Sequence, residues 1–135
     1  MNSLDSLNAG PRDTATLLID IQPSASRRIC IELQSDERLV VCVMSTVPID
    51  MFLCTDAEFH VWARGVAPSR VLEERDGTTS ARFTFQARKT NHLSIVMVNE
   101  SASDAQVGID TVIVPASKPV VSECTKTRSS FLQVC

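Results

Sequence analysis

Glycine and aromatic residues are scarce in this 135-residue chain, and their scarcity excludes several kinds of binding site. There are only four glycines, and neither a G-x-G-x-x-G fingerprint nor a P-loop is present to hold a nucleotide phosphate. Five phenylalanines, one tryptophan and no tyrosine leave few rings on which bases could stack. The net charge of −3 provides no general attraction to nucleic acid. We therefore expect no cofactor and no nucleic-acid partner.

Long apolar runs are absent as well. No stretch approaches the roughly eighteen apolar residues that a membrane-spanning helix needs. The first residues, MNSLDSLNAGPRDT, show neither the positive charge nor the apolar segment of a secretory signal. From these two absences we expect no membrane insertion and a cytoplasmic location.

The five cysteines form no C-x-x-C pair, and their number is odd. Cys30, Cys42 and Cys54 each lie in an apolar, strand-like run, where a free cysteine behaves as a small hydrophobic residue. We therefore interpret these three as thiols of the core, in preference to disulfides or metal ligands.

The segment from Arg82 to Asn99 carries the clearest structural pattern. Ala81, Phe83, Phe85 and Ala87 alternate with polar residues, which is typical of a half-buried strand. After the break at 89–91, the run 92–99 is almost continuously apolar and predicts a central strand. We expect these two strands to form a β-hairpin.

Short apolar or alternating runs separated by turn residues occupy most of the remaining chain, and they predict an all-β, antiparallel β-sandwich of the jelly-roll kind. A polar turn at 35–38 favours antiparallel pairing of the strands on either side of it, and 75–78 is the strongest turn signal. The segment 56–65 fits either a strand or a short helical turn. We favour the helical turn, with Asp56 as N-cap and Gly65 as its end. About eight strands result, the others being 16–21, 27–35, 39–44, 49–55, 71–74 and 107–114.

The length of the chain is suited to a single domain. We expect a flexible lead-in over 1–15, the sandwich over 16–115, and a tail over 116–135 that is either a linker or an extra edge strand. The hydrophobic fraction of 44% and the charged fraction of 21% are those of an ordinary globular domain.

Three stretches in order resemble a known group of domains: PIDMFLCTDAEFHVWARG from Pro48, ARFTFQA from Ala81, and NHLSIVMVNESASDAQVGIDTVIV from Asn91. Together they look like the bacterial pre-peptidase C-terminal domain and the related Golgi-dynamics (GOLD) type sandwiches. The chain departs from that pattern at Thr90-Asn91-His92, where those domains usually carry tyrosine and glycine. The resemblance implies an accessory domain without catalytic residues.

Catalytic and metal-binding constellations are weak in the sequence. Cys54 and His60 are close along the chain, but no third group is apparent to orient the imidazole. Asp50 and Asp56, or Asp104 and Asp110, could offer oxygen ligands, yet simpler structural roles explain them. Asn99-Glu100-Ser101 matches a glycosylation acceptor, although Asn99 is better explained as the end of a strand.

From these observations we predict that the chain is a non-enzymatic accessory module that mediates protein–protein interaction or self-association. Its candidate interaction residues are Trp62, Arg82, Arg88 and Lys89. One alternative is a sandwich that binds carbohydrate or another small ligand by stacking it on Trp62. A second alternative is the subunit of a jelly-roll shell.

Overall fold

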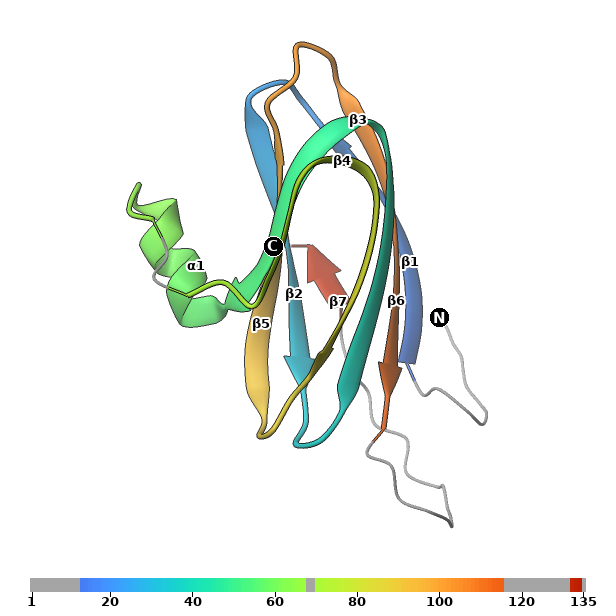
Figure 1. The fold of residues 1–135 in the computed structure, drawn as a ribbon, viewed down its shortest axis with the longest axis vertical. Coiled ribbons are helices and arrows are strands. Elements are labelled where there is room, and N and C mark those ends of the chain that lie inside the picture. The colour runs from blue at the N-terminus through green and yellow to red at the C-terminus, as the bar shows by residue number, and fades with distance from the viewer. Residues whose placement is uncertain (1–12, 68–69, 116–131, 135) are drawn as a thin grey trace.

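The computed structural model describes residues 13–67, 70–115 and 132–134 of the chain. Within them lie seven β-strands and one short α-helix, so the predicted antiparallel all-β fold is confirmed (Figure 1). In chain order the elements are β1 (Asp13–Ile21), β2 (Ala25–Leu33), β3 (Arg38–Thr55), α1 (Asp56–Ala63), β4 (Glu73–Gln86), β5 (Asn91–Asn99), β6 (Ala105–Val114) and β7 (Leu132–Val134).

The long strand β3 belongs to both layers of the sandwich. Its first part, Arg38 to Ser45, pairs with β6, and its last part, Asp50 to Thr55, pairs with β5. β4 follows β3 along both parts, so the two strands arch together from one layer to the other (Figure 1). One layer therefore has the order β1-β6-β3-β4, and the other has β4-β3-β5-β2-β7. We call them the β1 layer and the β2 layer.

Alternate residues of the strands face inward and form one core between the layers. The predicted inward face of β2, with Ile29, Ile31 and Leu33, is confirmed, and so are the central positions of β5 and of the first part of β3. Other fully buried inward side chains come from β1, β3, β5 and β6: Ile21, Leu39, Val41, Val43, Ile49, Met51, Leu53, Leu93, Ile95, Met97, Ala105, Val107 and Ile109.

Two predicted hairpins are wrong. β2 does not pair with β3, since its partners are β5 and β7, and β4 pairs with β3 instead of β5. Both short polar connections cross between the layers. They also bind each other, because Asp36 N donates to Ala87 O and Ala87 N donates to Glu37 O, each at 2.9 Å. A polar turn of a few residues can span packed sheets as well as fold one strand back on its neighbour, since the sheets are only about 10 Å apart.

Two predicted strand breaks prove to be bends inside longer strands. Pro48 does not end a strand but lies within β3, where the pairing register with β4 shifts between Met44 and Ile49. The predicted turn at 75–78 is likewise internal to β4. There Gly77 takes a φ of +57°, and its N–H donates to Asp50 Oδ1 at 2.7 Å. Proline and glycine are tolerated inside strands at such irregularities, because the ladder of backbone hydrogen bonds is already interrupted there.

The predicted helical turn is α1, but its N-cap is Thr55 and not Asp56. Thr55 Oγ1 accepts a hydrogen bond from Glu58 N at 3.3 Å, so it takes one of the amide groups that a helix start leaves unpaired. Asp56 is the first helical residue, and its carboxylate is therefore free for another role. Gly65 ends the helix as predicted, with a φ of +86° and its N–H donating to Trp62 O at 2.9 Å.

Asn99 closes β5 through a buried network of hydrogen bonds. Its Nδ2 donates to Ile21 O at 2.9 Å and to Ser103 O at 2.8 Å, while its Oδ1 accepts from the backbone N and the hydroxyl of Ser101. The side chain is fully buried, and both amide hydrogens are used. The structural interpretation of Asn99 is therefore confirmed, and a glycan cannot be attached to this nitrogen in the folded chain.

Candidate functional site

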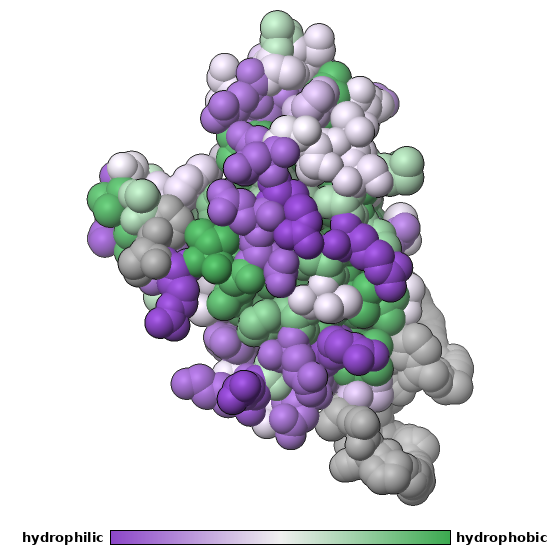
Figure 2. Space-filling view, in the orientation of Figure 1, coloured by the Kyte–Doolittle hydropathy of each residue, from purple (hydrophilic) through white to green (hydrophobic). Residues whose placement is uncertain are grey.

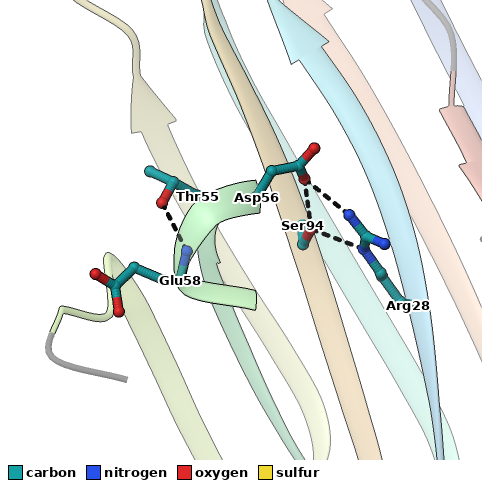
Figure 3. Close-up of polar contacts among 5 residues, drawn as sticks. All are labelled: Arg28, Thr55, Asp56, Glu58 and Ser94. Atoms are coloured by element: carbon teal, nitrogen blue, oxygen red, sulfur yellow. Dashed lines mark hydrogen bonds and ion pairs between the residues drawn. The ribbon is translucent and has the colours of Figure 1, made fainter. Parts of the chain in front are cut away.

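The outer side of the β2 layer carries a closed set of polar contacts beneath α1. Arg28 on β2 donates through Nε to Ser94 Oγ and through Nη2 to Asp56 Oδ1, both at 3.0 Å. Ser94 on β5 is fully buried and donates in turn to Asp56 Oδ1 at 2.9 Å (Figure 3). These three residues join β2, β5 and the first turn of α1. Because each polar group satisfies another, the cluster fixes the helix to the sheet.

Aromatic side chains complete the attachment of α1. The Phe59 ring lies under the Arg28 guanidinium, 3.9 Å from its carbon to the ring centroid. Trp62 meets Phe52 of β3 edge to face at 5.5 Å and lies 5.9 Å from Phe59. None of the helix residues is fully buried, and α1 projects from the sandwich as a separate lobe in both overall views (Figures 1 and 2).

The three cysteines of the described segments occupy three different environments. Cys54 is fully buried on the outer side of β3, where the loss of solvent on burial, followed by the negative charges of Glu58 and Asp56, raises the pKa of its thiol to about 11. It therefore stays protonated and unreactive at neutral pH. Cys42 is a free, half-buried thiol on the outer side of β3. Cys54 is thus a free, buried thiol as predicted, whereas Cys42 is only half-buried and does not belong to the core.

Cys30 is disulfide-bonded, and its predicted state as a free core thiol is also wrong. It lies on the outer side of β2, because inward-facing Ile29 and Ile31 flank it.

The described residues contain no group of three or more side chains suited to hold a metal ion. Asp110 is exposed and accepts a hydrogen bond from Thr16 Oγ1 at 2.7 Å across β1 and β6. Asp56 is used by Arg28 and Ser94, and Asp50 by Gly77. Each of these carboxylates thus has a structural partner.

The outer side of the β1 layer presents large apolar side chains to solvent. Leu18 on β1 is 86% exposed and Met44 on β3 is 68% exposed. Both are in register with Gly108 of β6, which lies between them, and the Leu18 side chain reaches within 3.5 Å of where a Cβ would stand on that glycine. We call Leu18, Gly108 and Met44 the apolar row. Because Gly108 has no side chain, the centre of the row does not project from the sheet and is accessible to a partner.

The four predicted interaction residues do not lie on one face. Trp62 is half-buried over the β2 layer, where it packs on Phe52. Arg82 lies on the outer side of the β1 layer, with its Nη1 3.7 Å from Cys42 Sγ. Arg88 and Lys89 are exposed in the connection between β4 and β5.

Sequence reasoning missed both the Arg28–Asp56–Ser94 cluster and the apolar row. Some signal for each was present: Ser94 interrupts an apolar run, and Thr16 to Ile21 places Leu17 and Leu18 side by side, so one of them had to face outward.

The arrangement of two antiparallel layers with one long strand shared between them defines a β-sandwich of the jelly-roll kind. Among solved structures, the chain is similar in fold to the Yersinia pseudotuberculosis-derived mitogen (YPM), with a TM-score of 0.52 and 13% sequence identity. The similarity covers 84% of this chain and 97% of the mitogen. It supports the fold alone. No protein-family model and no curated protein matches the sequence.

A helix able to cross a membrane would have to be far longer and more apolar than α1, and the described residues contain none.

Proposed function

We propose that this chain is a non-catalytic protein-interaction module that binds its partner through the outer side of the β1 layer. The observation that carries the proposal is the exposure of Leu18 and Met44 on either side of Gly108. Large apolar side chains that adjoin on a regular sheet surface are a common feature of contact sites, whereas scattered single ones are not informative.

The surroundings of the row favour a protein surface as partner. Its neighbouring outward residues include Val40, Cys42 and Val112, all half-buried, and Thr16 paired with Asp110. This mixture of an apolar centre with a few paired polar groups is typical of protein–protein contacts. Because the face is built on strands of one sheet, it is rigid and suited to a partner of complementary shape.

The alternative of carbohydrate binding through Trp62 has weaker support. Stacking a sugar needs a free aromatic face, while the Trp62 ring is engaged with Phe52 and Phe59 in holding α1. Catalysis by a Cys54–His60 pair is also disfavoured, since Cys54 is buried with a raised pKa and the His60 ring packs beside Phe59. The mitogenic activity in the name of the structural neighbour belongs to that protein, and we carry over only the fold.

The disulfide at Cys30 bears on location. Stable disulfides form in oxidising compartments and are rare in the cytoplasm. We therefore propose that the chain works in an oxidising environment, in place of the cytoplasm expected from the sequence. Mass spectrometry of the protein isolated from its own cells, with thiols blocked before lysis, would find Cys30 oxidised. Quantitative alkylation of Cys30 in that sample would contradict this location.

The interaction proposal is tested by affinity capture from the source cells with three forms of the chain. The double variant Leu18→Asp/Met44→Asp places two charges on the apolar row, and Val66→Asp is the matched control, because Val66 is 55% exposed in the segment after α1. We expect the wild type and the control to retain the same specific proteins and the double variant to lose them. Equal retention by all three forms would overturn the use of this face.

A further inference from the structure

The edges of the sandwich are protected unequally. The outer edge of β2 is covered by β7, which pairs with Ile29 to Ile31. β4 carries Arg75 and Arg82 and is bent at Gly77, and charges and bulges of this kind discourage pairing with another chain. At the other end of the strand order, β7 is only three residues long, so the remaining long edge is β1, which among the described residues pairs only with β6.

β1 lacks the features that protect an edge. From Thr14 to Ile19 its sequence is TATLLI, with no charge, no proline and no glycine, and threonine, leucine and isoleucine suit an extended strand. An edge strand of this composition offers a row of unpaired backbone N–H and C=O groups to any extended partner.

The apolar row begins on this same edge, since Leu18 belongs to β1. We propose that the partner at this face is a second copy of the chain, joined by antiparallel pairing of the two β1 strands about a two-fold axis. The inference rests on the proposed function and gives the partner of that face. The axis passes beside Leu17, so that each β1 lies along the full length of the other. The β1 layers of the two copies then form one continuous sheet.

The side chains agree with this register. Pairing about Leu17 sets Leu18 opposite Thr16 of the other copy, and the two Leu18 side chains become diagonal neighbours, within reach of each other. Asp20 comes opposite Thr14, so no carboxylate faces another. The hydrogen bond from Thr16 to Asp110 across β1 and β6 shows that this sheet already accommodates such threonine–aspartate pairs. The apolar rows of the two copies meet at the axis through their Leu18 side chains. They form one apolar band that extends from Met44 of one copy to Met44 of the other.

An isologous contact of this kind closes on itself, because the same strand serves both copies. It therefore yields a dimer and not a filament.

The test is sedimentation velocity of the full chain from about 1 μM to about 1 mM, a range that includes weak association, with a non-reducing gel to exclude covalent dimers. Thr16→Lys and Leu18→Lys each add a charge to the edge at an exposed position, so both should fold, and Val66→Lys is the control. We expect the wild type and the control to dimerise and each edge variant to associate at least about tenfold more weakly, since the two introduced lysines would be diagonal neighbours of like charge at the axis.

Hydrogen exchange at the same concentrations supplies an independent reading. In the dimer, alternate amides between Thr14 and Ile21 become protected, because alternate N–H groups of an edge strand point outward. A wild type that stays monomeric overturns the inference, as does a dimer unchanged by Thr16→Lys and Leu18→Lys. If Leu18→Lys dissociates the dimer while Thr16→Lys and the β1 amides are unaffected, the copies meet face to face and strand pairing is overturned. In each of these cases the affinity capture with Leu18→Asp/Met44→Asp still tests separately whether this face binds a partner protein.

Discussion

Asp56 at the start of α1 accepts a hydrogen bond from Ser94 in the middle of β5, with 2.9 Å between Oδ1 and Oγ. The contact joins a helix that contains no fully buried residue to the centre of a sheet. Arg28 completes the cluster, and its side chain is only 16% exposed, against 39% for Asp56. The helix thus depends on a few polar and aromatic contacts, and this dependence can be measured.

Asp56→Ala should lower the free energy of unfolding by about 1–2 kcal/mol, because it leaves the guanidinium of Arg28 and the hydroxyl of Ser94 without their acceptor. It should also speed hydrogen exchange in α1 more than in β5. The control is Glu73→Ala, which breaks the more exposed Arg75–Glu73 pair at 3.2 Å and should cost less than about 0.5 kcal/mol. Denaturant titration of both variants gives the comparison, and equal losses would show that the cluster is an ordinary surface ion pair.

Asn99→Ala should be more costly, about 2–4 kcal/mol, since it removes the buried donor to Ile21 O and one of the two donors to Ser103 O, and leaves a cavity where the amide was packed. Asn99→Asp should also destabilise, because a carboxylate cannot donate to either oxygen. Ser101→Ala is a milder change, as the backbone N–H of Ser101 still donates to Asn99. Chemical denaturation should rank the three variants with the two at Asn99 well below Ser101→Ala. A loss under about 0.5 kcal/mol for Asn99→Ala would contradict the role assigned to it.

The raised pKa of the Cys54 thiol predicts that the folded chain loses stability at alkaline pH. Its pKa is raised from 9.0 to about 11 in the folded chain, so between these values the unfolded chain loses a proton that the folded chain keeps. The contribution of this thiol is therefore fully present below pH 9 and declines as the pH rises towards 11. Cys54→Ala should show a shallower decline over that interval. Parallel curves for the two proteins would argue against a buried, protonated thiol.

Thiol labelling distinguishes the two free cysteines. In the native chain at pH 8, Cys42 should react faster than Cys54, because Cys42 is half-buried beside the Arg82 guanidinium, whereas Cys54 is fully buried beneath α1. Labelling followed by peptide mass spectrometry measures both sites in one sample. Asp56→Ala should accelerate Cys54 by loosening the helix and leave Cys42 unchanged. Faster labelling of Cys54 than of Cys42 in the wild type would contradict this placement.

Trp62 reports on the carbohydrate alternative, since it is the only tryptophan in the chain. We expect its fluorescence to be unaffected by a panel of soluble sugars and to shift to longer wavelength in Phe52→Ala, because Phe52 is its edge-to-face partner. A saturable change with one sugar would revive the alternative.

The sequence predicted the faces of the strands but not their partners. Alternation assigns Ile29, Ile31 and Leu33 to one side of β2, as the structure confirms, because the two-residue period is a property of a single strand. Pairing depends on contacts distant along the chain, so β2 could not be matched to β5 from the pattern, and the breaks at 35–38 and 89–91 were misinterpreted as hairpin turns.

The candidate sites were less predictable for the same reason. Arg28, Asp56 and Ser94 come from three elements, and only the fold brings them together. Trp62 was predicted as a contact residue or a stacking platform for a ligand, but Phe52 and Phe59 pack against its ring. The resemblance to pre-peptidase C-terminal and GOLD-type sandwiches stays a prediction.

Oxidative footprinting of the methionines tests the central claim most directly, namely that the outer side of the β1 layer is a contact surface. Met44 is exposed, while Met51 and Met97 are fully buried and serve as internal references. With mild peroxide, the dilute purified chain should form sulfoxide at Met44 before it does so at Met51 or Met97. In the partner-bound form, recovered from its cells or by raising the concentration of the chain, Met44 should be protected relative to the dilute chain. Equal oxidation of Met44 in the bound and the dilute forms would contradict the account.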